Sequence, residues 1–215
     1  NHTTILGADY SRNKIDTTYN YGYLSSTLGN IISKAVYMQD DWKFNQRWNL
    51  IYGARYDNHS WAGEKTTPNI NLGYTFDNKT NMYFGYSRFF VAPTLYQYTD
   101  PTYGNRQLKP ETGYNYELGI NHKLSNTLSL TSHIFKRKTN NKIVYDSLIY
   151  GYKNVKEDAT GFDLQLNKIF NKHLTAYAGY TYNHFTADTL GDNDNGYFPK
   201  YVVNIGADYS INKFD

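Results

Sequence analysis

Apolar residues occupy every second position through most of this chain. Residues 48–56, WNLIYGARY, place Trp, Leu, Tyr, Ala and Tyr at the even positions, with Asn, Gly and Arg among the odd ones. Residues 69–76, NINLGYTF, divide in the same way, and the pattern occurs four times between Lys34 and Phe90. A repeat of two residues is typical of β-strands, whereas a helix repeats every 3.6 residues. The pattern therefore predicts a sheet with one apolar and one polar face.

Short polar turns alternate with longer connections along the chain. The clusters at 45–47, 77–80, 125–127 and 171–173 each separate two alternating segments and are typical of hairpin turns. Longer connections, rich in Gly, Tyr, Asp and Pro, are predicted at 12–33, 58–67, 91–113, 145–160 and 188–200. Tight turns on the periplasmic side and long loops outside are typical of outer-membrane barrels.

The fold class that follows is all-β. We predict one domain, residues 1–215, formed by an antiparallel up-and-down transmembrane β-barrel of about ten strands. The first strand should begin near Thr3 and the last should end near Tyr209. An even number of strands places both chain ends on the side of the short turns.

The two faces of the predicted strands suit lipid and a polar interior. Lipid-facing residues are expected to be Leu6, Val36, Met38, Trp42, Phe84, Leu118, Ile120, Leu130, Phe162, Leu164, Leu166, Tyr180, Val203 and Ile205. Inward-facing residues are expected to be Asp9, Gln39, Arg55, Asn71, Ser87, Glu117, Asp163, Gln165, Thr181 and Asp208. A slip of one residue would place the charges in hydrocarbon, at about 2–4 kcal/mol for a basic residue at the midplane, so one register should dominate. Large apolar residues bracket the short turns, where an interfacial girdle belongs: Trp42, Phe44, Trp48, Phe76, Leu124 and Phe170.

Glycines lie on the predicted inward face of most strands. They are Gly7, Gly53, Gly73, Gly85, Gly119, Gly161, Gly179 and Gly206. Glycine weakens a strand unless the sheet bends sharply or another group approaches closely. The glycines therefore indicate either strong curvature or room for a plug or a ligand. The pentapeptide GADYS at 7–11 recurs at 206–210, so the first and last strands would be natural neighbours if the sheet closes.

The composition excludes several classes of protein. No segment approaches the ~18 consecutive apolar residues of a membrane helix, and the absence of cysteine excludes disulfides and thiolate metal sites. A net charge of +3 with scattered basic residues gives no basis for nucleic-acid binding. The 24 tyrosines suit a boundary between water and lipid, because tyrosine has an apolar ring and a polar hydroxyl. The six histidines lack metal-ligand spacing, so we predict no metal site and no cofactor.

An enzyme is disfavoured. Some ten-stranded outer-membrane barrels are proteases, and the only residues here that could serve such chemistry are Asp40 and Asp41 with His133 or His184. Asp40 and Asp41 alternate faces and lie near the short-turn end, far from an outer cleft. We therefore predict no catalytic residues.

Residues 89–119 read FFVAPTLYQYTDPTYGNRQLKPETGYNYELG. This segment resembles a loop and the following strand of the TonB-dependent outer-membrane receptors. The matching residues are Ala92, Pro93, Thr94, Gly104, Asn105, Leu108, Lys109, Pro110, Glu111, Glu117, Leu118 and Gly119. Residues 37–57, and residues 152–154 with 161–163, resemble other recurrent parts of the family's barrel, so the resemblance spans most of the chain.

The resemblance implies a receptor in the bacterial outer membrane that takes up a metal chelate. Residues 91–119 contain no histidine, which heme receptors of the family carry in this loop, so the cargo is expected to be a siderophore complex or cobalamin-like. Two positions depart from the family pattern: Arg106 replaces the usual proline, and Val91 stands where arginine is frequent.

The family's barrel has 22 strands and is plugged. About ten strands would therefore be the central part of a receptor barrel, partial or truncated, without the plug and without the last strands. Its partners would be the lipid bilayer, lipopolysaccharide and the chelate, with a plug domain and TonB only in a full-length receptor. Alone, the chain is not expected to perform energy-coupled import.

Candidate ligand-binding residues lie in this loop. Tyr96, Tyr98, Tyr103 and Arg106 could bind an anionic or aromatic chelate through stacking, hydroxyl donors and a bidentate cation, or the tyrosines could pack on one another. Trp61, Tyr150 and Tyr197 are weaker candidates in other outer loops. We expect Ala92, Pro93, Asn105, Leu108, Pro110 and Glu111 to be architectural, because proline fixes the backbone and Asn or Glu can tie a loop to strand ends.

Two other interpretations stay open. One is a small autonomous outer-membrane barrel that acts as a narrow pore, an adhesin or a structural protein. The other is a soluble tyrosine-rich β-sandwich, which is disfavoured because too many outward positions are apolar. The membrane interpretation requires that no second protein layer covers the apolar face.

Overall fold

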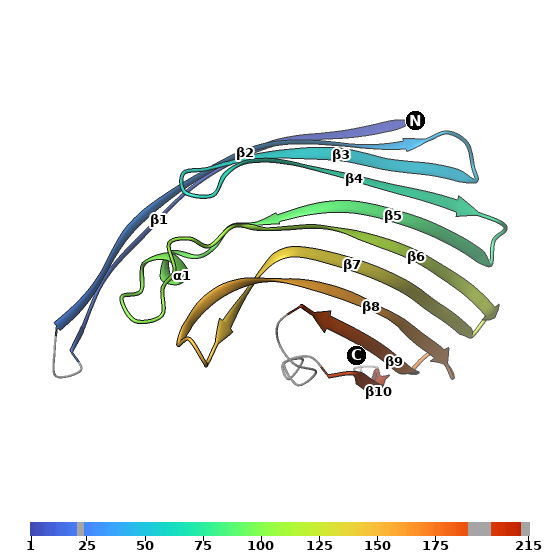
Figure 1. The fold of residues 1–215 in the computed structure, drawn as a ribbon. Helices are drawn as coiled ribbons and strands as arrows, with labels where there is room; N and C mark the ends of the chain where they lie inside the picture. The colour runs from blue at the N-terminus through green and yellow to red at the C-terminus, as the bar shows by residue number, and fades with distance from the viewer. Residues whose placement is uncertain (21–23, 189–198, 212–215) are drawn as a thin grey trace.

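The computed structural model describes residues 1–20, 24–188 and 199–211. In this part of the chain ten strands form one antiparallel sheet whose spatial order is the chain order (Figure 1). The strands are β1 (His2–Asn20), β2 (Leu24–Lys43), β3 (Trp48–His59), β4 (Gly63–Thr75), β5 (Thr80–Val91), β6 (Glu111–Ser125), β7 (Leu128–Asp146), β8 (Gly151–Ile169), β9 (Leu174–Ala187) and β10 (Tyr201–Tyr209). The helix α1 (Leu95–Thr99) lies between β5 and β6. The predicted all-β, up-and-down architecture is confirmed.

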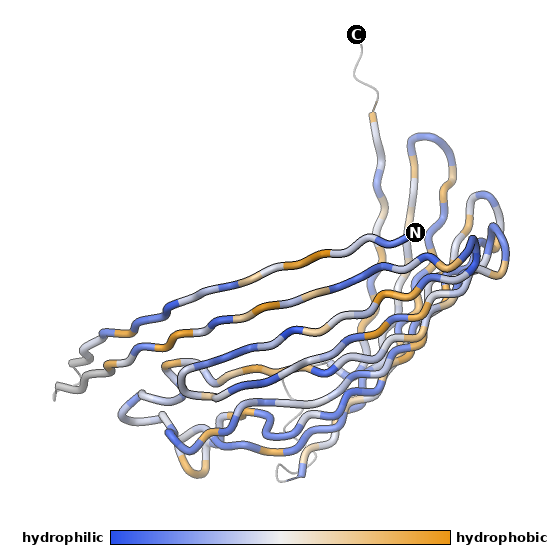
Figure 2. Tube along the Cα trace, turned by 90° about the horizontal axis from the view of Figure 1, so that it is seen from above, coloured by the Kyte–Doolittle hydropathy of each residue, from blue (hydrophilic) through white to orange (hydrophobic). Residues whose placement is uncertain are grey.

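The sheet is a curved trough (Figures 1 and 2). Pairing runs from β1 through to β10, and within the described residues no pairing joins β10 back to β1. The two GADYS segments therefore lie on opposite edges of the sheet. The chain forms part of a barrel wall and not a closed ten-stranded barrel.

Several strands are longer than the sequence predicted. β1, β2, β7 and β8 contain 19, 20, 19 and 19 residues, whereas about 9–11 residues cross a bilayer. The loops predicted at 12–33, 58–67 and 145–160 are wrong, because pairing continues through nearly all of these residues. Their polar and glycine-rich composition resembles that of a loop, although these residues pair in the sheet.

The short turns and the two remaining long connections can be compared with the structure in the same way. The short turns occur where they were predicted, and the long connection predicted at 91–113 is confirmed between Val91 and Glu111. Most of the connection predicted at 188–200 lies outside the described residues.

The register separates an apolar face from a polar one. Residues that are directly opposite in neighbouring strands share a face. One such row crosses nine strands: Trp42, Leu50, Leu72, Phe84, Leu118, Ile134, Phe162, Tyr182 and Tyr201. Arg55, Asn71, Glu117 and Asp163 belong to the opposite face, as predicted.

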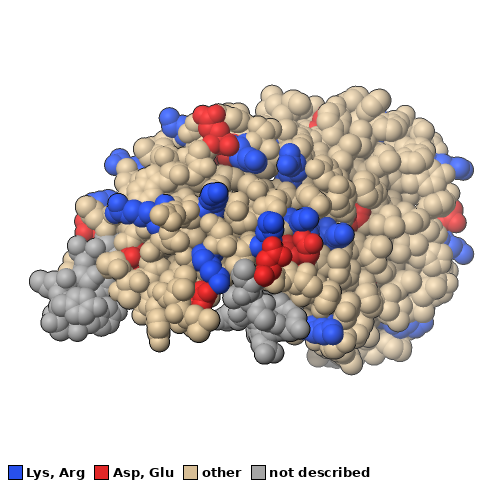
Figure 3. Space-filling view, viewed as in Figure 1, with Lys and Arg blue, Asp and Glu red and all other residues tan. Residues whose placement is uncertain are grey.

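The apolar face is uncovered. Leu6 is 73 % exposed, Ile134 is 54 % exposed and Ile205 is 80 % exposed. The described residues form a single sheet, so the β-sandwich, which needs a second sheet over this face, is wrong. Figure 3 shows charged side chains gathered toward the end that carries α1 and the tips of β1 and β2, and a broad surface over the other half with almost none.

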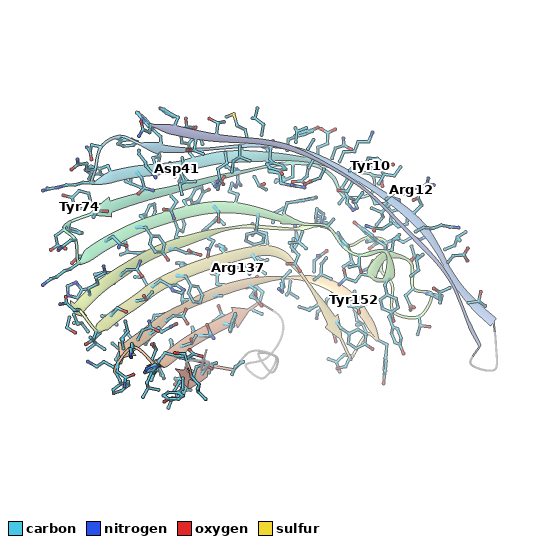
Figure 4. All side chains as sticks on the ribbon, turned by 180° about the vertical axis from the view of Figure 1, so that it is seen from behind. Tyr10, Arg12, Asp41, Tyr74, Arg137 and Tyr152 are labelled. Atoms are coloured by element: carbon cyan, nitrogen blue, oxygen red, sulfur yellow. The ribbon has the colours of Figure 1, made fainter. Side chains whose placement is uncertain are left out.

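Aromatic contacts line the short-turn end of the sheet. Trp42 and Phe44 have ring centroids 4.2 Å apart, and Tyr74, labelled in Figure 4, lies 4.4 Å from Trp48 and 4.6 Å from Phe76. This cluster lies where the sequence predicted an interfacial girdle.

Inward-facing glycines make room for rings on the neighbouring strand. Tyr83 lies directly opposite Gly119, and a Cβ atom on Gly119 would overlap the Tyr83 ring. Tyr177 covers Gly206 in the same way. The rings therefore lie flat along the inner wall instead of projecting from it, a pairing that compensates for the weak packing of glycine in a strand.

Replacing Gly119 by alanine should destabilise the sheet by about 1–3 kcal/mol, the usual cost of overpacking. The matched control is Gly85→Ala on the facing strand, where the nearest atom to the new Cβ is Asn71 Nδ2 at 3.5 Å. Thermal unfolding in detergent, followed by heat-modifiable gel migration, measures both variants. Equal shifts in the two variants would contradict the proposed ring contact.

Candidate ligand-binding site at the long loop

The loop between β5 and β6 is ordered by its own side chains. Thr94 caps α1 because its hydroxyl accepts from the Gln97 amide at 3.2 Å, and the Gln97 side chain accepts from the Thr94 amide at 2.9 Å. After the helix, the Asp100 carboxylate accepts from the amides of Thr102 and Tyr103 at 3.0 and 2.8 Å. These local bonds fix a helix and a turn in a segment that has no strand partner.

The loop packs on the β1–β2 hairpin through a small apolar cluster. Leu95, Tyr98 and Leu108 are 5–8 % exposed and contact Ile31 of β2, which is 4 % exposed. Gly29 allows this approach, because a Cβ there would lie 2.7 Å from Leu95 Cδ2. Gly29 and Ile31 lie an even number of residues from the inward-facing Gln39 of β2 and share its face, so the loop lies on the concave side of the sheet.

Hydrogen bonds tie the same loop to the tip of the β7–β8 hairpin. Asn154 of β8 accepts from the Lys109 amide at 2.8 Å and donates to the Lys109 carbonyl at 3.0 Å. The Asn105 side chain donates to the Tyr152 carbonyl at 2.9 Å. The loop therefore connects two hairpins that are far apart in the sheet.

Glu111 anchors the end of the loop to β7. One carboxylate oxygen accepts from the Ile143 amide at 2.9 Å, and Lys142 Nζ lies 3.8 Å from the other. The register of β7 shifts between Thr139 and Lys142, and Asn141 has φ 55°. A bulge bends its strand, which turns this hairpin toward the loop.

An ion pair holds the tip of the same hairpin. Lys153 Nζ lies 2.5 Å from Asp146 Oδ2, and the Leu148 amide donates to Asp146 Oδ1 at 2.8 Å. The Lys153 ammonium, with this amide, lowers the pKa of Asp146 below its usual value. The charge of Asp146 therefore persists into acidic solution.

The predicted ligand residues divide into two groups. Tyr98 and Arg106 line a hollow of about 400 Å³ together with Trp61 and Leu28. Tyr96 and Tyr103 do not line it. They lie at the ends of a row of four tyrosine rings in which Tyr96 contacts Tyr152, and Tyr145 contacts both Tyr152 and Tyr103, at 5.6–6.3 Å between centroids. Tyr152 is labelled in Figure 4, beside the loop.

Tyr98 is mostly enclosed. It is 5 % exposed, and its hydroxyl donates to the Leu108 carbonyl at 3.3 Å. Burial raises the pKa of Tyr98, so the hydroxyl stays protonated. Its ring meets the Trp61 ring at 5.3 Å and 60°.

The remaining predicted residues are placed as follows. Pro93 is buried, Ala92 and Pro110 are half-buried, Tyr150 at the β7–β8 turn is 68 % exposed, and Tyr197 lies outside the described residues. Among the described lining residues, Leu28, 66 % exposed, is the one that the sequence did not single out, because no local pattern distinguishes it from other leucines.

The hollow combines a cation with two aromatic rings. Arg106 is exposed and forms no ion pair with any residue that the structure describes. A free guanidinium beside the Trp61 and Tyr98 rings suits an anionic or planar aromatic group. Among the described residues, no group of three or more His, Cys, Asp or Glu is placed to hold a metal ion.

Asp40, one of the acidic residues considered for catalysis, pairs with His2 and not with His133. Asp40 Oδ2 lies 2.7 Å from His2 Nδ1, and Asp40 Oδ1 accepts from the Thr4 hydroxyl at 2.6 Å. His133 instead lies 2.9 Å from Asp163 on the concave face, and the Thr181 hydroxyl donates to the same Asp163.

No helix within residues 1–20, 24–188 and 199–211 is long and apolar enough to cross a membrane.

The up-and-down sheet, its uncovered apolar face and the folded loop define part of an outer-membrane receptor barrel. The chain belongs to the TonB-dependent receptor family: the family model described as TonB dependent receptor-like, beta-barrel matches residues 1–215. This family consists of transport receptors.

Relatives within the family carry different cargoes. The vitamin B12 transporter BtuB of Vibrio cholerae is 39 % identical over 111 residues, which are 51 % of this chain and 18 % of that protein. A ferrioxamine receptor of Yersinia enterocolitica is 27 % identical over 179 residues, which are 76 % of this chain and 24 % of that receptor. The chain therefore matches only about a fifth to a quarter of the length of these relatives.

Solved structures share the fold. The siderophore receptor PirA from Pseudomonas aeruginosa superposes with a TM-score of 0.73 and 24 % identity, over 86 % of this chain and 37 % of that one. The ferripyoverdine receptor of the outer membrane of the same organism, bound to ferripyoverdine, gives a TM-score of 0.74 at 17 % identity, over 99 % of this chain and 34 % of that one. The open trough thus matches about a third of the length of each of these receptor chains.

Removing the Asn154 side chain should loosen the long loop. Asn154→Ala loses both bonds to Lys109 and one to the Asn141 carbonyl, each worth about 0.5–1.5 kcal/mol. Only the two bonds to Lys109 hold the loop, so the fraction of molecules with an open loop should rise at least about fivefold.

Trypsin cleavage after Arg106 in detergent measures this opening. Asn167→Ala is the matched control, because Asn167 lies on the same strand and its side chain accepts only from Gln165, at 3.0 Å. Equal cleavage rates in the two variants would show that Asn154 does not hold the loop.

Proposed function

We propose that this chain forms part of the wall and mouth of a bacterial outer-membrane receptor that takes up a metal chelate, either a ferric siderophore or a cobalamin. The observation that carries the proposal is the hollow beside the long loop, in which Arg106 has no ion-pair partner among the described residues and stands next to the Trp61 and Tyr98 rings. Membership of the family and relatives named for vitamin B12 and ferrioxamine support this class of cargo.

Arg106 and Trp61 are the proposed direct ligand contacts in this hollow. Tyr98 supports the Trp61 ring and keeps its hydroxyl on the loop backbone, so its proposed role is to position the aromatic wall. Tyr96 and Tyr103 stay predicted contacts for a ligand that extends toward the tyrosine row.

The loop-motif residues have a proposed structural role. Asn105 and Glu111 bind backbone groups of the β7–β8 hairpin, and Leu108 fills the apolar cluster. Pro93 is buried. Ala92, which precedes it, and Pro110, at the end of the loop, are half-buried. None of these side chains lines the hollow.

The proposed surroundings follow from the two faces of the sheet. The convex apolar face would contact the lipid bilayer and lipopolysaccharide, because apolar side chains are uncovered there. In a full-length receptor, the concave polar face would contact a plug domain, and that receptor would also engage TonB. We infer a transport role without catalysis, and this chain alone would not perform energy-coupled import. An autonomous small barrel receives no support, because the described strands do not close.

Arg106→Ala should weaken binding of an anionic ferric chelate by roughly 10- to 150-fold, because a hydrogen bond to a charged group contributes about 1.5–3 kcal/mol. Equilibrium binding of labelled ferric enterobactin, ferrioxamine and cyanocobalamin to outer membranes that contain the protein measures the effect. Lys109→Ala is the matched control, because Lys109 is an exposed cation of the same loop outside the hollow. Failure of every ligand to bind, or the same loss in both variants, would refute the proposal.

A further inference from the structure

A histidine side chain holds the turn between β3 and β4. His59, the last residue of β3, accepts through Nδ1 from the Trp61 amide at 3.2 Å and from the Ala62 amide at 3.0 Å. The turn closes at Gly63, whose φ of 78° suits glycine. Trp61 lines the hollow beside Arg106, so this turn positions one wall of the proposed ligand site.

Other turns of the chain use the same pair of hydrogen bonds with a different acceptor. In each, one side-chain oxygen accepts from the backbone amides two and three residues further along, and the residues that supply it are Asn45, Asp77, Asp100 and Asn171. A side-chain amide does not titrate, and a carboxylate takes up a proton only near about pH 4. An imidazole does so near about pH 6.5. The turn that carries Trp61 therefore has an acceptor that titrates close to neutral pH.

The two bonds fix the protonation state of the His59 ring. Nδ1 accepts from two amides, so it carries no proton, and the single ring proton lies on Nε2. A second proton, on Nδ1, would convert this acceptor into a donor that faces two other donors. Protonation therefore breaks both bonds and leaves the Trp61 and Ala62 amides without their acceptor.

The surroundings of His59 also oppose a positive charge. Its side chain is 8 % exposed, and burial lowers the pKa of His59 below its usual value. The residues directly opposite it in the sheet are uncharged: Ser33 of β2 and Gly63 of β4. His59 forms no ion pair with a residue that the structure describes.

No nearby carboxylate is left to hold a proton on His59. The charged and titratable groups of the surrounding elements are Arg55 and Asp57 on β3, Lys34 on β2, Glu64 and Lys65 on β4, and Tyr98, Asp100 and Arg106 on the long loop. Asp57 pairs with Arg55 at 2.9 Å, and Glu64 accepts from Asn58 at 2.8 Å. Asp100 accepts from two amides of its own loop.

We propose that His59 makes the hollow sensitive to pH: the turn is closed in neutral solution, and proton uptake in mildly acidic solution releases Trp61 from Tyr98 and opens the aromatic wall. His59 is a positioning residue, because it acts on the hollow through Trp61. This inference rests on the proposed function and concerns the regulation of that site.

The direction of the effect follows from proton binding. The closed turn keeps His59 neutral, whereas an open turn frees the ring to take up a proton near about pH 6.5. Above this pH the closed turn is fully favoured. Below it, the ratio of open to closed turns rises by up to about tenfold per pH unit, until the closed turn also takes up a proton. Ser60 stays bonded to the backbone of Ile32 at any pH, so only the tip of the turn opens.

The experiment uses the full chain in detergent, labelled with fluorotryptophan and followed by fluorine NMR from neutral solution to about pH 4.5. The chain has three tryptophans, and Trp61→Phe identifies the Trp61 signal. That signal should move with a midpoint below about pH 6.5, whereas the signal of Trp48, at the short-turn end, should not. In His59→Asn the new side chain accepts from the same two amides without titrating, as Asn45 does, so the Trp61 signal should stay constant.

Two results would overturn the proposal: a Trp61 signal that does not move in the original protein, or one that moves equally in His59→Asn. Heat-modifiable migration reports whether each variant folds. His59→Leu tests the same bonds if the Asn variant does not fold, because leucine offers no acceptor. Its Trp61 signal should lie at the acidic position already in neutral solution, and a signal at the neutral position would contradict the role of His59.

Ligand binding separates this inference from the proposed function. Cyanocobalamin, ferric enterobactin or ferrioxamine, whichever binds in neutral solution, should bind the original protein several-fold more weakly at about pH 5.5, and this loss should be smaller in His59→Asn. The same pH dependence of binding in both proteins would refute the effect on the hollow. If none of these ligands binds, the proposed function fails, while the Trp61 signal still reports the turn.

Discussion

Backbone hydrogen bonding between neighbouring strands is the constraint from which this structure follows. Hydrocarbon offers no water to satisfy amide and carbonyl groups, so a strand that crosses a membrane has to pair on both sides, as the eight strands from β2 to β9 do. That requirement explains why ten strands pair in strict chain order, and why residues on the apolar face alternate with polar ones over so many positions. The side chains then need only suit their face: lipid on one side, and a polar space on the other.

The alternation of apolar and polar residues made the strands and their faces predictable from sequence, because a sheet with one polar and one apolar face imposes a period of two. The same signal fails toward the long-loop ends of the strands, where a paired strand with polar and small residues resembles a loop. The error at residues 12–33 has this origin, since polar and small residues there still form an unbroken ladder. The pairing of Gly119 with Tyr83 could not be predicted, because it depends on the register between β5 and β6. Composition does not determine that register.

The site was only partly accessible to prediction. The loop motif identified residues 92–111 as a special segment, but not that Tyr98 would turn inward to the Leu108 carbonyl. Nor could sequence show that Trp61 and Arg106, in different connections, meet at one hollow, because their meeting depends on α1 packing at Gly29. The alternative prediction, that the loop tyrosines pack on other tyrosines, describes Tyr96 and Tyr103. Arg106, by contrast, is exposed to solvent.

The row formed by Tyr96, Tyr152, Tyr145 and Tyr103 spans the junction between the loop and the β7–β8 hairpin. Rings at such separations in a fixed chiral array couple their electronic transitions. The protein therefore contains a built-in chromophore whose near-ultraviolet circular dichroism depends on contact between loop and hairpin. Undocking of the loop would change that spectrum without any added label.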